Sequence, residues 1–367
     1  MANTFQRTRQ TGLLHHDRDQ AYTGYVCYSS IYSEGEVYLI DLDGNAVHRW
    51  ETGYPAGLWG YLLPNGNLFY GGQDPNQPEL NRFPAWQLFR GGVMLEIDPQ
   101  GEVVWEHHDD HHHHDARRID GGGAIYLTVE PMRTDLVAQV GGGVPNGDET
   151  MWADVIVEVD SNGDRVWEWH VVDHLDPANH PLTFNDLRHE WSHGNTVVPV
   201  PAKGAAGAKV LASFRNISTV LLIDKASGRI DWELGPPLLA QQHDPNLLDN
   251  GHLLVFDNGC HRSNISLAFS RVLEIVPESG KIEWVYQDLP WTDFFSPFIS
   301  GARRLPNGNT LITEGCTGRM FQVTSAGEVV WEFVNPHVGP DPMGLYLIGQ
   351  NAVFRASHYA LGEIPWL

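Results

Sequence analysis

Cysteine is scarce in this chain of 367 residues. The three cysteines, Cys27, Cys260 and Cys316, are scattered and odd in number. Their spacing fits neither a metal-binding motif nor a disulfide framework. The sequence also contains no phosphate-cradling glycine-rich loop, no CxxC pair and no GxSxG nucleophile elbow. The usual signatures of a disulfide-stapled domain, a P-loop nucleotide site and an α/β-hydrolase are therefore missing.

Basic residues are few as well. The chain has 23 Lys and Arg against 46 Asp and Glu, which gives a net charge of -23. A surface of this charge repels nucleic acid and anionic membranes, so we expect neither as a main partner. An anionic substrate would need Arg or His concentrated around its site.

Long apolar runs are also absent. No stretch approaches the roughly 18 apolar residues of a membrane helix. Residues 1–12 lack the apolar region of a signal peptide. We therefore expect a cytoplasmic protein, and no feature of the sequence sets its oligomeric state.

Glycine, proline and aromatic residues, in contrast, are plentiful. The chain has 38 Gly, 23 Pro, 13 Trp and 12 Tyr, and only 19% of its residues are charged. This composition suits many short strands joined by tight turns. The chain is also too long for one simple core unless it is built of repeats.

A hairpin pattern recurs along the chain. In each copy a strand-like apolar run leads to a turn glycine, and a tryptophan follows four residues later, or six in the first copy. The turn glycines are Gly44, Gly101, Gly163, Gly228, Gly280 and Gly327. Each copy also holds a second hairpin signal. It is clearest in L-P-N-G-N at residues 63–67 and 305–309, where Asn-Gly favours a type I′ turn.

These repeats predict the fold. Each supplies about four strands, and no stretch has the pattern of a long amphipathic helix. Six such units predict an all-β, six-bladed β-propeller over residues 24–367, after an N-terminal extension at residues 1–23. The strand at 24–29 would close the ring by joining the unit with residues 351–355. An open β-solenoid is the alternative, and the tryptophans would pack between blades in the propeller.

Three histidines occupy one position in three of the repeats. His243 and His114 each stand eight residues before a turn glycine. His193 also precedes a β-branched run, and the strand after it leads to Arg215. The innermost strands of a propeller converge on its central channel, and ligands usually bind at one mouth of it. We therefore expect these histidines to meet around the axis as a candidate active site.

Aromatic residues are expected on the other side of the channel. The position that matches the histidines lies beside Trp59 and Tyr61 in the first unit, and follows Phe294 and Phe295 in the fifth. We expect these four residues to bind a small aromatic substrate. Arg355 is a further candidate, as the counterpart of Arg215 in the last unit, unless it pairs with an acidic neighbour.

Loops near this site carry further candidates. His261 and Arg262 follow the Asp-Asn-Gly turn and would line the mouth or serve as plain loop residues. The insert at residues 130–154 is expected to form a lid, from which Met132 and Trp152 would reach substrate. The tract His107–Asp115, H-H-D-D-H-H-H-H-D, is expected to be mostly a solvated loop able to pick up metal, with only its last histidine in the blade register.

Several motifs resemble the central signature of the arylsulfotransferase family. They are W-S-H-G-N-T-V-V, S-F-R-N-I-S-T-V-L-L-I-D-K-A-S-G-R-I-D-W, Q-H-D-P-N and F-F-S-P-F-I-S. The resemblance covers most of residues 30–355 and is strongest over 190–315. It implies a six-bladed propeller that moves a sulfuryl group between phenolic sulfate esters and phenols, in a ping-pong reaction through a sulfated histidine.

The resemblance also implies roles for individual residues. His243 matches the nucleophile, His193 and Arg215 match the residues that hold the sulfate oxygens, and His114 matches a further channel histidine. A neutral imidazole can attack sulfur, and cationic side chains can stabilise the negative charge on the transferring group. The mechanism requires no cofactor. Exported members of the family carry an amino-terminal β-domain and a disulfide, so this chain resembles a short cytoplasmic branch.

Two other functions stay open at this point. His114, His193 and His243 around one axis could ligate Zn or Cu and leave a position for water. The protein would then be a metal-dependent lyase, hydrolase or oxidase acting on an aromatic small molecule. It could also be a propeller that binds a ligand without catalysis.

Overall fold

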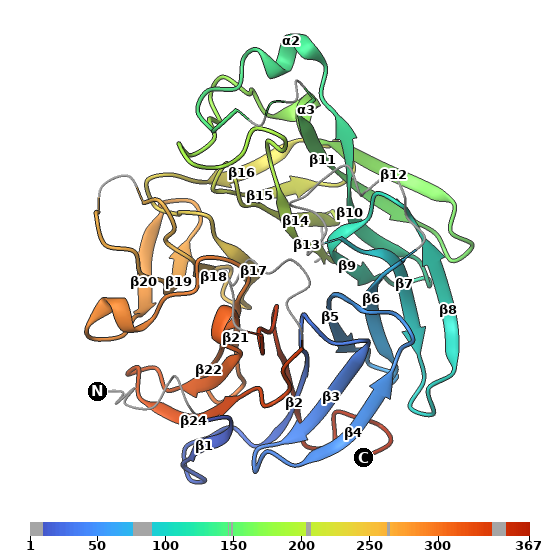
Figure 1. The fold of residues 1–367 in the computed structure, drawn as a ribbon, viewed down its shortest axis with the longest axis vertical. Helices are drawn as coiled ribbons and strands as arrows, with labels where there is room; N and C mark the ends of the chain where they lie inside the picture. The colour runs from blue at the N-terminus through green and yellow to red at the C-terminus, as the bar shows by residue number, and fades with distance from the viewer. Residues whose placement is uncertain are drawn as a thin grey trace.

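A computed structural model describes residues 10–75, 90–145, 147, 150–202, 207–262, 265–339 and 350–367. Over these residues, the strands form six antiparallel sheets arranged as blades around a central axis, which is a six-bladed β-propeller (Figure 1). The open solenoid is therefore wrong. The described helices are single turns, α2 (Thr134–Val137), α3 (Val171–His174) and the 3-10 turns Trp291–Asp293 and Gly315–Thr317. None of them is long and apolar enough to cross a membrane.

In blades 2 to 6 the first strand along the chain lies next to the axis, whereas in blade 1 the innermost strand is the last strand of the chain. From the innermost to the outermost strand, blade 1 is β25 (Ser357–Ala360), β2 (Gly24–Ser29), β3 (Glu36–Asp41) and β4 (Ala46–Glu51), blade 2 is β5 (Ala56–Leu62), β6 (Leu68–Gln73), β7 (Gly92–Ile97) and β8 (Val103–His108), and blade 3 is β9 (His113–Arg118), β10 (Ala124–Pro131), β11 (Trp152–Val159) and β12 (Arg165–His170). Blade 4 is β13 (Gly194–Val200), β14 (Lys209–Phe214), β15 (Thr219–Asp224) and β16 (Ile230–Leu234), blade 5 is β17 (His243–Leu247), β18 (Leu253–Asp257), β19 (Arg271–Val276) and β20 (Lys281–Tyr286), and blade 6 is β21 (Gly301–Arg304), β22 (Thr310–Glu314), β23 (Arg319–Val323) and β24 (Val329–Val334).

Blade 1 closes the ring. Its innermost strand, β25, comes from the carboxyl-terminal part of the chain and pairs with β2, and Ser30 forms a bridge with Val353. The expected joining of these two segments is thus confirmed. Strand β1 (Gly12–His16) adds a fifth strand to blade 6 by pairing with β24. Part of the stretch expected to be an extension therefore belongs to the propeller, where it covers the outer edge of that sheet.

The turn glycines behave as the sequence predicts. All six adopt positive φ, between 68° and 90°, in the turns that lead into the outermost strands. The L-P-N-G turns differ from the expected type I′ geometry. Gly66 has a φ of 84° and donates its N–H to the carbonyl of Leu63, whereas Asn65 is not among the residues with positive φ. The proline before Asn65 fixes a negative φ, which suits a type I turn followed by a left-handed glycine.

The tryptophans join neighbouring blades. An indole Nε1–H of one blade donates to a backbone carbonyl of the next in the pairs Trp50–Asp98, Trp105–Ser161, Trp167–Lys225, Trp284–Ser325 and Trp331–Leu42. The last pair connects blade 6 to blade 1, so these five bridges join every junction except that of blades 4 and 5. Packing between blades, as expected from the sequence, is the role of these side chains.

Burial falls from the axis outward. The third strand of blade 2, β7, is buried along its whole length, whereas the outermost strand, β8, is largely exposed. The apolar clusters lie between adjacent blades, because both faces of each inner strand are covered by a neighbour. This rigid ring fixes the positions at which the innermost strands begin.

Candidate active site

The innermost strands of blades 2 to 5 begin with a break in register. Pairing skips residues between Ala56 and Gly60, between His113 and Ala116, between Gly194 and Thr196, and between His243 and Asn246. Such bulges re-aim side chains and are frequent beside active sites. Three residues at these places, His114, His193 and Asp244, also have positive φ values of 54°, 53° and 55°. This backbone is costly for a residue with a Cβ, so the fold holds it in place.

The three expected histidines come together where these innermost strands begin. The ring centroids of His114 and His193 lie 4.6 Å apart, with the rings nearly perpendicular. The rings of His114 and His243 each lie 6.3 Å from the ring of Phe354. All three histidines are buried. The predicted meeting of these side chains is therefore present in the structure.

His243 is held in one tautomer. Its Nδ1 lies 2.8 Å from Oδ1 of Asn258, and Nδ2 of Asn258 donates to the carbonyls of Ser296 and Ile299 at 2.7 and 2.9 Å. Because the amide donates on one side, its oxygen must accept from Nδ1–H of His243. Burial, together with the positive charge of Arg215, holds the pKa of His243 well below its usual value. The ring is thus neutral near pH 7, with its lone pair on Nε2.

His193 has a carboxylate partner. Its Nδ1 lies 2.6 Å from Oε2 of Glu190, and both side chains are buried. Burial alone would raise the pKa of Glu190, but His193 and His189 lower it well below its usual value. Glu190 is therefore an anion that orients the ring of His193 and stabilises positive charge on it.

His114 is backed by a second histidine. The Nδ1 atoms of His113 and His114 lie 2.7 Å apart, and Nε2 of His113 lies 3.0 Å from Oδ1 of Asp154. Burial, followed by the charges of its neighbours His193 and His113, holds the pKa of His114 well below its usual value. The three histidines thus have three different partners: an amide, a carboxylate and an imidazole.

Arg215 stands beside these rings. Its backbone N–H donates to the carbonyl of His193 at 2.9 Å. Its guanidinium donates to Oε1 of Gln241 at 2.9 Å and lies 3.4 Å from Oδ1 of Asp186, while Nε has no hydrogen-bond partner among the described residues. The same guanidinium lies over the ring of Phe298, 5.0 Å from its centroid. This cation is close enough to His243 to lower its pKa.

A layer of charged residues lies directly behind the histidines. Asp115 and Asp244 each follow a site histidine, and Arg355 lies 3.1 Å from Oδ2 of Asp115 and 3.4 Å from Oδ1 of Asp244. Arg355 also donates to the carbonyl of Asn195 at 2.9 Å. The guanidinium is only 1% exposed. Arg355 therefore pairs with acidic neighbours across the axis, which was the second of the two roles considered for it.

Arg355 is also not the counterpart of Arg215. Arg215 follows the second strand of its blade, β14, whereas Arg355 precedes the innermost strand of blade 1, β25. The sequence alignment of the last unit failed because that unit is completed by strands from the other end of the chain.

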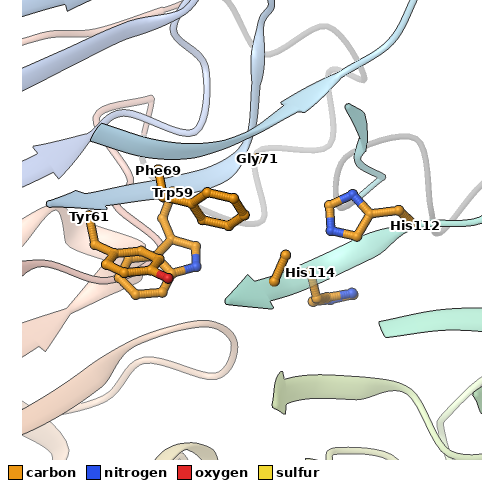
Figure 2. A pocket seen from close by; sticks show the side chains of 7 residues that line it. Trp59, Tyr61, Phe69, Gly71, His112 and His114 are labelled. Carbon is orange, nitrogen blue, oxygen red and sulfur yellow. The ribbon is translucent and has the colours of Figure 1, made fainter. Parts of the chain in front are cut away.

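One part of the expected aromatic wall is present. Trp59 lies in the bulge of blade 2, stacks on Tyr61 at 5.1 Å and donates from Nε1 to Asp115 at 3.1 Å. Figure 2 shows Trp59, Tyr61 and Phe69 facing His112 and His114 across a small cavity, whose volume of about 10 Å³ suits a single water molecule.

The other part of the expected aromatic wall, Phe294 and Phe295, is not present at the site. Phe294 is 0% exposed and packs on Phe256, Tyr286 and Phe321, in the core between blades 5 and 6. Phe295 is only partly buried, and its backbone N–H donates to Glu314. The aromatic residue of this segment that faces the site is Phe298, beneath Arg215. The repeat position did not predict which side chains face the site there, because the segment is a 3-10 turn followed by a loop.

The loops also differ from expectation. In Figure 1, α2 of the insert lies at the edge of the ring, away from the axis, so this described part of the insert does not form the expected lid over the channel. Met132 is buried in the core beneath it. The backbone of Trp152 exchanges hydrogen bonds with His189 and Trp191, so the insert supports the segment that carries Glu190.

The histidine tract is mostly interior. Within His107–Asp115 only His108 and Asp110 are exposed, and the last four residues are buried. The expected solvated loop is wrong, because the tract passes from β8 directly into the innermost strand β9. At the mouth, His261 lies beside Asn185 and Phe184, whereas Arg262 pairs with Asp257.

A metal centre gains no support from the geometry. Within the described ranges, no group of three or more His, Cys, Asp or Glu side chains is arranged to hold a metal ion. Nδ1 of His243 and of His193 is directed at Asn258 and Glu190 respectively. Sequence reasoning missed these two partners. Asn258 was recognised only as part of a turn. For Glu190, the only clue in the sequence was its position three residues before His193.

Comparisons with known proteins agree with this architecture. A family model described as Arylsulfotransferase (ASST) matches residues 86–336, more than half of the chain. No curated protein matches the chain. A solved protein of unknown function from Bacteroides caccae shares 14% sequence identity with a TM-score of 0.54, over 92% of this chain and 98% of that chain. At this identity the likeness shows the fold alone.

Two further solved structures are more distant. A streptogramin B lyase shares 13% identity with a TM-score of 0.47, over 88% of this chain and 82% of that chain. The β-propeller domain of Cps50 (Swd1) from Myceliophteria thermophila shares 12% identity with a TM-score of 0.45, over 90% of this chain and 91% of that chain.

Proposed function

This chain belongs to the arylsulfotransferase family, and we propose that it moves a sulfuryl group from a phenolic sulfate ester to a phenol. Between the two steps the sulfuryl group is carried on Nε2 of His243. A covalent intermediate divides one difficult transfer into two easier ones. The substrates are small aromatic molecules, and the mechanism requires no metal or cofactor.

The state of His243 carries this proposal. Its hydrogen bond to Asn258, 2.8 Å long, keeps the proton on Nδ1 and the lone pair on Nε2. Burial keeps the pKa of His243 low, so the ring is not blocked by a second proton near neutral pH. An unprotonated imidazole nitrogen is the form that attacks sulfur.

The neighbours of His243 stabilise the charge of the transferring group. Negative charge is spread over its oxygens during transfer, as in phosphoryl transfer. Arg215 supplies a planar cation, and His193 supplies a ring whose positive charge Glu190 stabilises. Fixed cations in a site that excludes water are effective because they need no reorganisation during the reaction.

Bonds and protons balance over the cycle. In the first step Nε2 of His243 attacks sulfur, and the bond from sulfur to the aryl oxygen breaks with its electron pair on oxygen. In the second step the oxygen of the acceptor attacks sulfur, and the electron pair of the S–N bond returns to Nε2. The proton that the acceptor loses equals the one that the first aryl oxide gains.

The test is a pulse of 4-nitrophenyl sulfate without an acceptor. We expect one equivalent of 4-nitrophenol to be released in a burst, and mass spectrometry to find one added SO₃ group on the peptide that contains His243. His243→Asn should abolish both the burst and turnover with a normal thermal midpoint. His252→Asn is the matched control, because His252 is partly exposed and bonds Glu274 on the outer surface.

One outcome would overturn the covalent mechanism. Suppose that protein purified without a nickel column forms no adduct and contains a transition metal. If chelators then abolish activity, and the His114, His193 and His243 variants lose the metal, these histidines are ligands of a metal centre.

A further inference from the structure

The side-chain amide of Asn258 is held in one orientation. Its Nδ2 lies between the carbonyl oxygens of Ser296 and Ile299, at 2.7 and 2.9 Å, and its Oδ1 faces Nδ1 of His243 at 2.8 Å. Turning the amide would set its oxygen against two carbonyl oxygens. Asn258 is 0% exposed and directly follows strand β18, which pairs with the strand that carries His243.

An amide differs from a carboxylate in one respect that bears on this site. Both accept a hydrogen bond from an imidazole N–H, but only a carboxylate is a base. The electron-withdrawing sulfuryl group makes Nδ1–H of a sulfated ring much more acidic than that of an ordinary imidazolium, so a carboxylate partner could take this proton whereas an amide could not. His193 has a carboxylate partner, Glu190, whereas His243 has an amide. The two histidines are therefore supported in chemically different ways.

We propose that Asn258 is a positioning residue that keeps the proton on Nδ1 of His243 throughout the cycle, so that the sulfated ring stays positively charged and reactive. This inference rests on the proposed function. Under this inference, the buried amide of Asn258 keeps the sulfated histidine reactive toward the acceptor in the second half of the reaction.

The chemistry follows from the charge of the leaving group. Attack by Nε2 on sulfur leaves the ring with the sulfuryl group on Nε2 and the proton on Nδ1, as a cation. When the acceptor attacks, the S–N bond breaks and a neutral imidazole leaves. If Nδ1 had lost its proton, an imidazolide anion would have to leave, which is far less favourable. A residue that cannot take this proton therefore keeps the intermediate from becoming inert.

Asn258→Asp separates the two halves of the reaction. One carboxylate oxygen still accepts from Nδ1–H, so we expect the burst of 4-nitrophenol from 4-nitrophenyl sulfate to persist. The other oxygen faces the carbonyls of Ser296 and Ile299, so we also expect a lower thermal midpoint. Transfer to added phenol should slow by on the order of 10²-fold, the scale of a misplaced acid–base group, and the sulfated peptide should accumulate at steady state. A variant that turns over at the wild-type rate without accumulating the adduct would overturn the proposal.

Asn258→Leu gives the opposite pattern. It removes the acceptor, so the proton of His243 is no longer confined to Nδ1, and the burst itself should slow. Asn335→Asp is the matched control. Asn335 is a buried asparagine whose Nδ2 donates to the carbonyl of Asn351 at 2.9 Å. Asn335→Asp therefore also replaces an amide donor that faces a carbonyl oxygen with an oxygen, but away from His243. It should lower the thermal midpoint without changing the ratio of the two half-reactions.

A measurement on the wild-type protein keeps the proposal testable if Asn258→Asp fails to fold. In ¹⁵N-histidine-labelled protein pulsed with 4-nitrophenyl sulfate, the sulfated ring should show a protonated Nδ1 at pH 7. A deprotonated Nδ1 in the adduct would overturn this inference while leaving the covalent mechanism intact. Absence of any adduct in the wild type would instead overturn the proposed function.

Discussion

Single residues distinguish the histidines of the site. His243 faces an amide, His193 faces the carboxylate of Glu190, and His114 faces the imidazole of His113. Each partner sets where a proton lies and how much positive charge the ring can bear. Three residues of one type, at one repeat position, are thereby given different chemistry by their neighbours.

Arg215→Lys tests the cation beside the nucleophile. Lysine keeps the charge but loses the planar fork that can hold two oxygens of the sulfuryl group. We expect turnover of an aryl sulfate to fall by about 10²- to 10³-fold, the usual effect of losing a donor to developing negative charge. The thermal midpoint should stay close to that of the wild type.

Arg262→Lys serves as the control for Arg215. Arg262 is a buried arginine that pairs with Asp257 rather than with a site histidine, and Arg262→Lys should leave turnover unchanged. Wild-type turnover in Arg215→Lys would remove Arg215 from the site.

His112 predicts a pH dependence of stability. Burial, followed by the charge of His113, lowers the pKa of His112 to about 3. In the unfolded chain this ring takes up a proton near pH 6.5, but in the folded chain it does not, so folding loses stability as the pH falls from about 6.5 to 3. Between pH 7 and pH 4 we expect His112→Gln to lose about 3 kcal/mol less than the wild type.

Chemical denaturation at the two pH values measures this difference. His112→Gln is expected to be less stable than the wild type at pH 7, because it also disturbs the hydrogen bond from the N–H of Gly92 to Nδ1. Equal losses in the two proteins would show that His112 is protonated in the folded state.

At the scale of elements, the tryptophan bridges determine how blades hold together. Trp331 is 0% exposed and donates to the carbonyl of Leu42 at 2.8 Å, across the junction where the ring closes. Trp331→Phe leaves that carbonyl without its donor and also leaves a cavity. We expect a cost of about 2–4 kcal/mol, seen as a lower midpoint of chemical denaturation.

Trp284→Phe is the comparison for this prediction. Trp284 donates to Ser325 at 2.8 Å but is only partly buried, so its loss should cost less than half as much. Equal costs at the two positions would mean that the deeper burial of Trp331 adds nothing to its bridge.

The strands and turns could be predicted from the sequence because their signals are local. A glycine in each turn and a tryptophan at fixed spacing require only short-range geometry, and all six turn glycines have the expected positive φ. The four bulges could not be predicted, because a break in register depends on the partner strand. They place Trp59, His114 and Asp244 at the axis.

The hydrogen-bond partners of the site histidines were also not predicted from the sequence. The three histidines were predicted from their shared repeat position, whereas Asn258 and Glu190 were not, since an Asn in a turn has many other uses. Phe294 was expected in the site and lies in the core between blades, because a loop has no fixed alternation of sides. The cytoplasmic location inferred from the sequence stays a prediction.

At the scale of the whole molecule, net charge opposes the proposed donor. A protein with a formal charge of -23 repels an anionic sulfate ester on approach. Salt screens this repulsion, since the Debye length falls from about 30 Å at 0.01 M to about 8 Å at 0.15 M. We therefore expect kcat/KM for 4-nitrophenyl sulfate to rise several-fold over this range.

A neutral phenol acceptor provides the control in the same experiment, because its kcat/KM should change little with salt. A fall in kcat/KM for the sulfate ester would mean that the arginines near the axis govern the approach of the donor rather than the surface.

The position of Arg355 has a consequence for biosynthesis. This residue neutralises Asp115 and Asp244 across the axis, yet it belongs to the last-made part of the ring, next to β25. Asp115 also pairs with Arg117 of its own strand, and Asp244 with Arg303 of blade 6, so each carboxylate keeps one cation without Arg355. While the chain is still being translated, what is missing is the cation that links the two carboxylates to each other. The link between blades 3 and 5 through Arg355 can form only after residue 355 has been made, so a nascent chain released before that point should have blades that lack this connection across the axis.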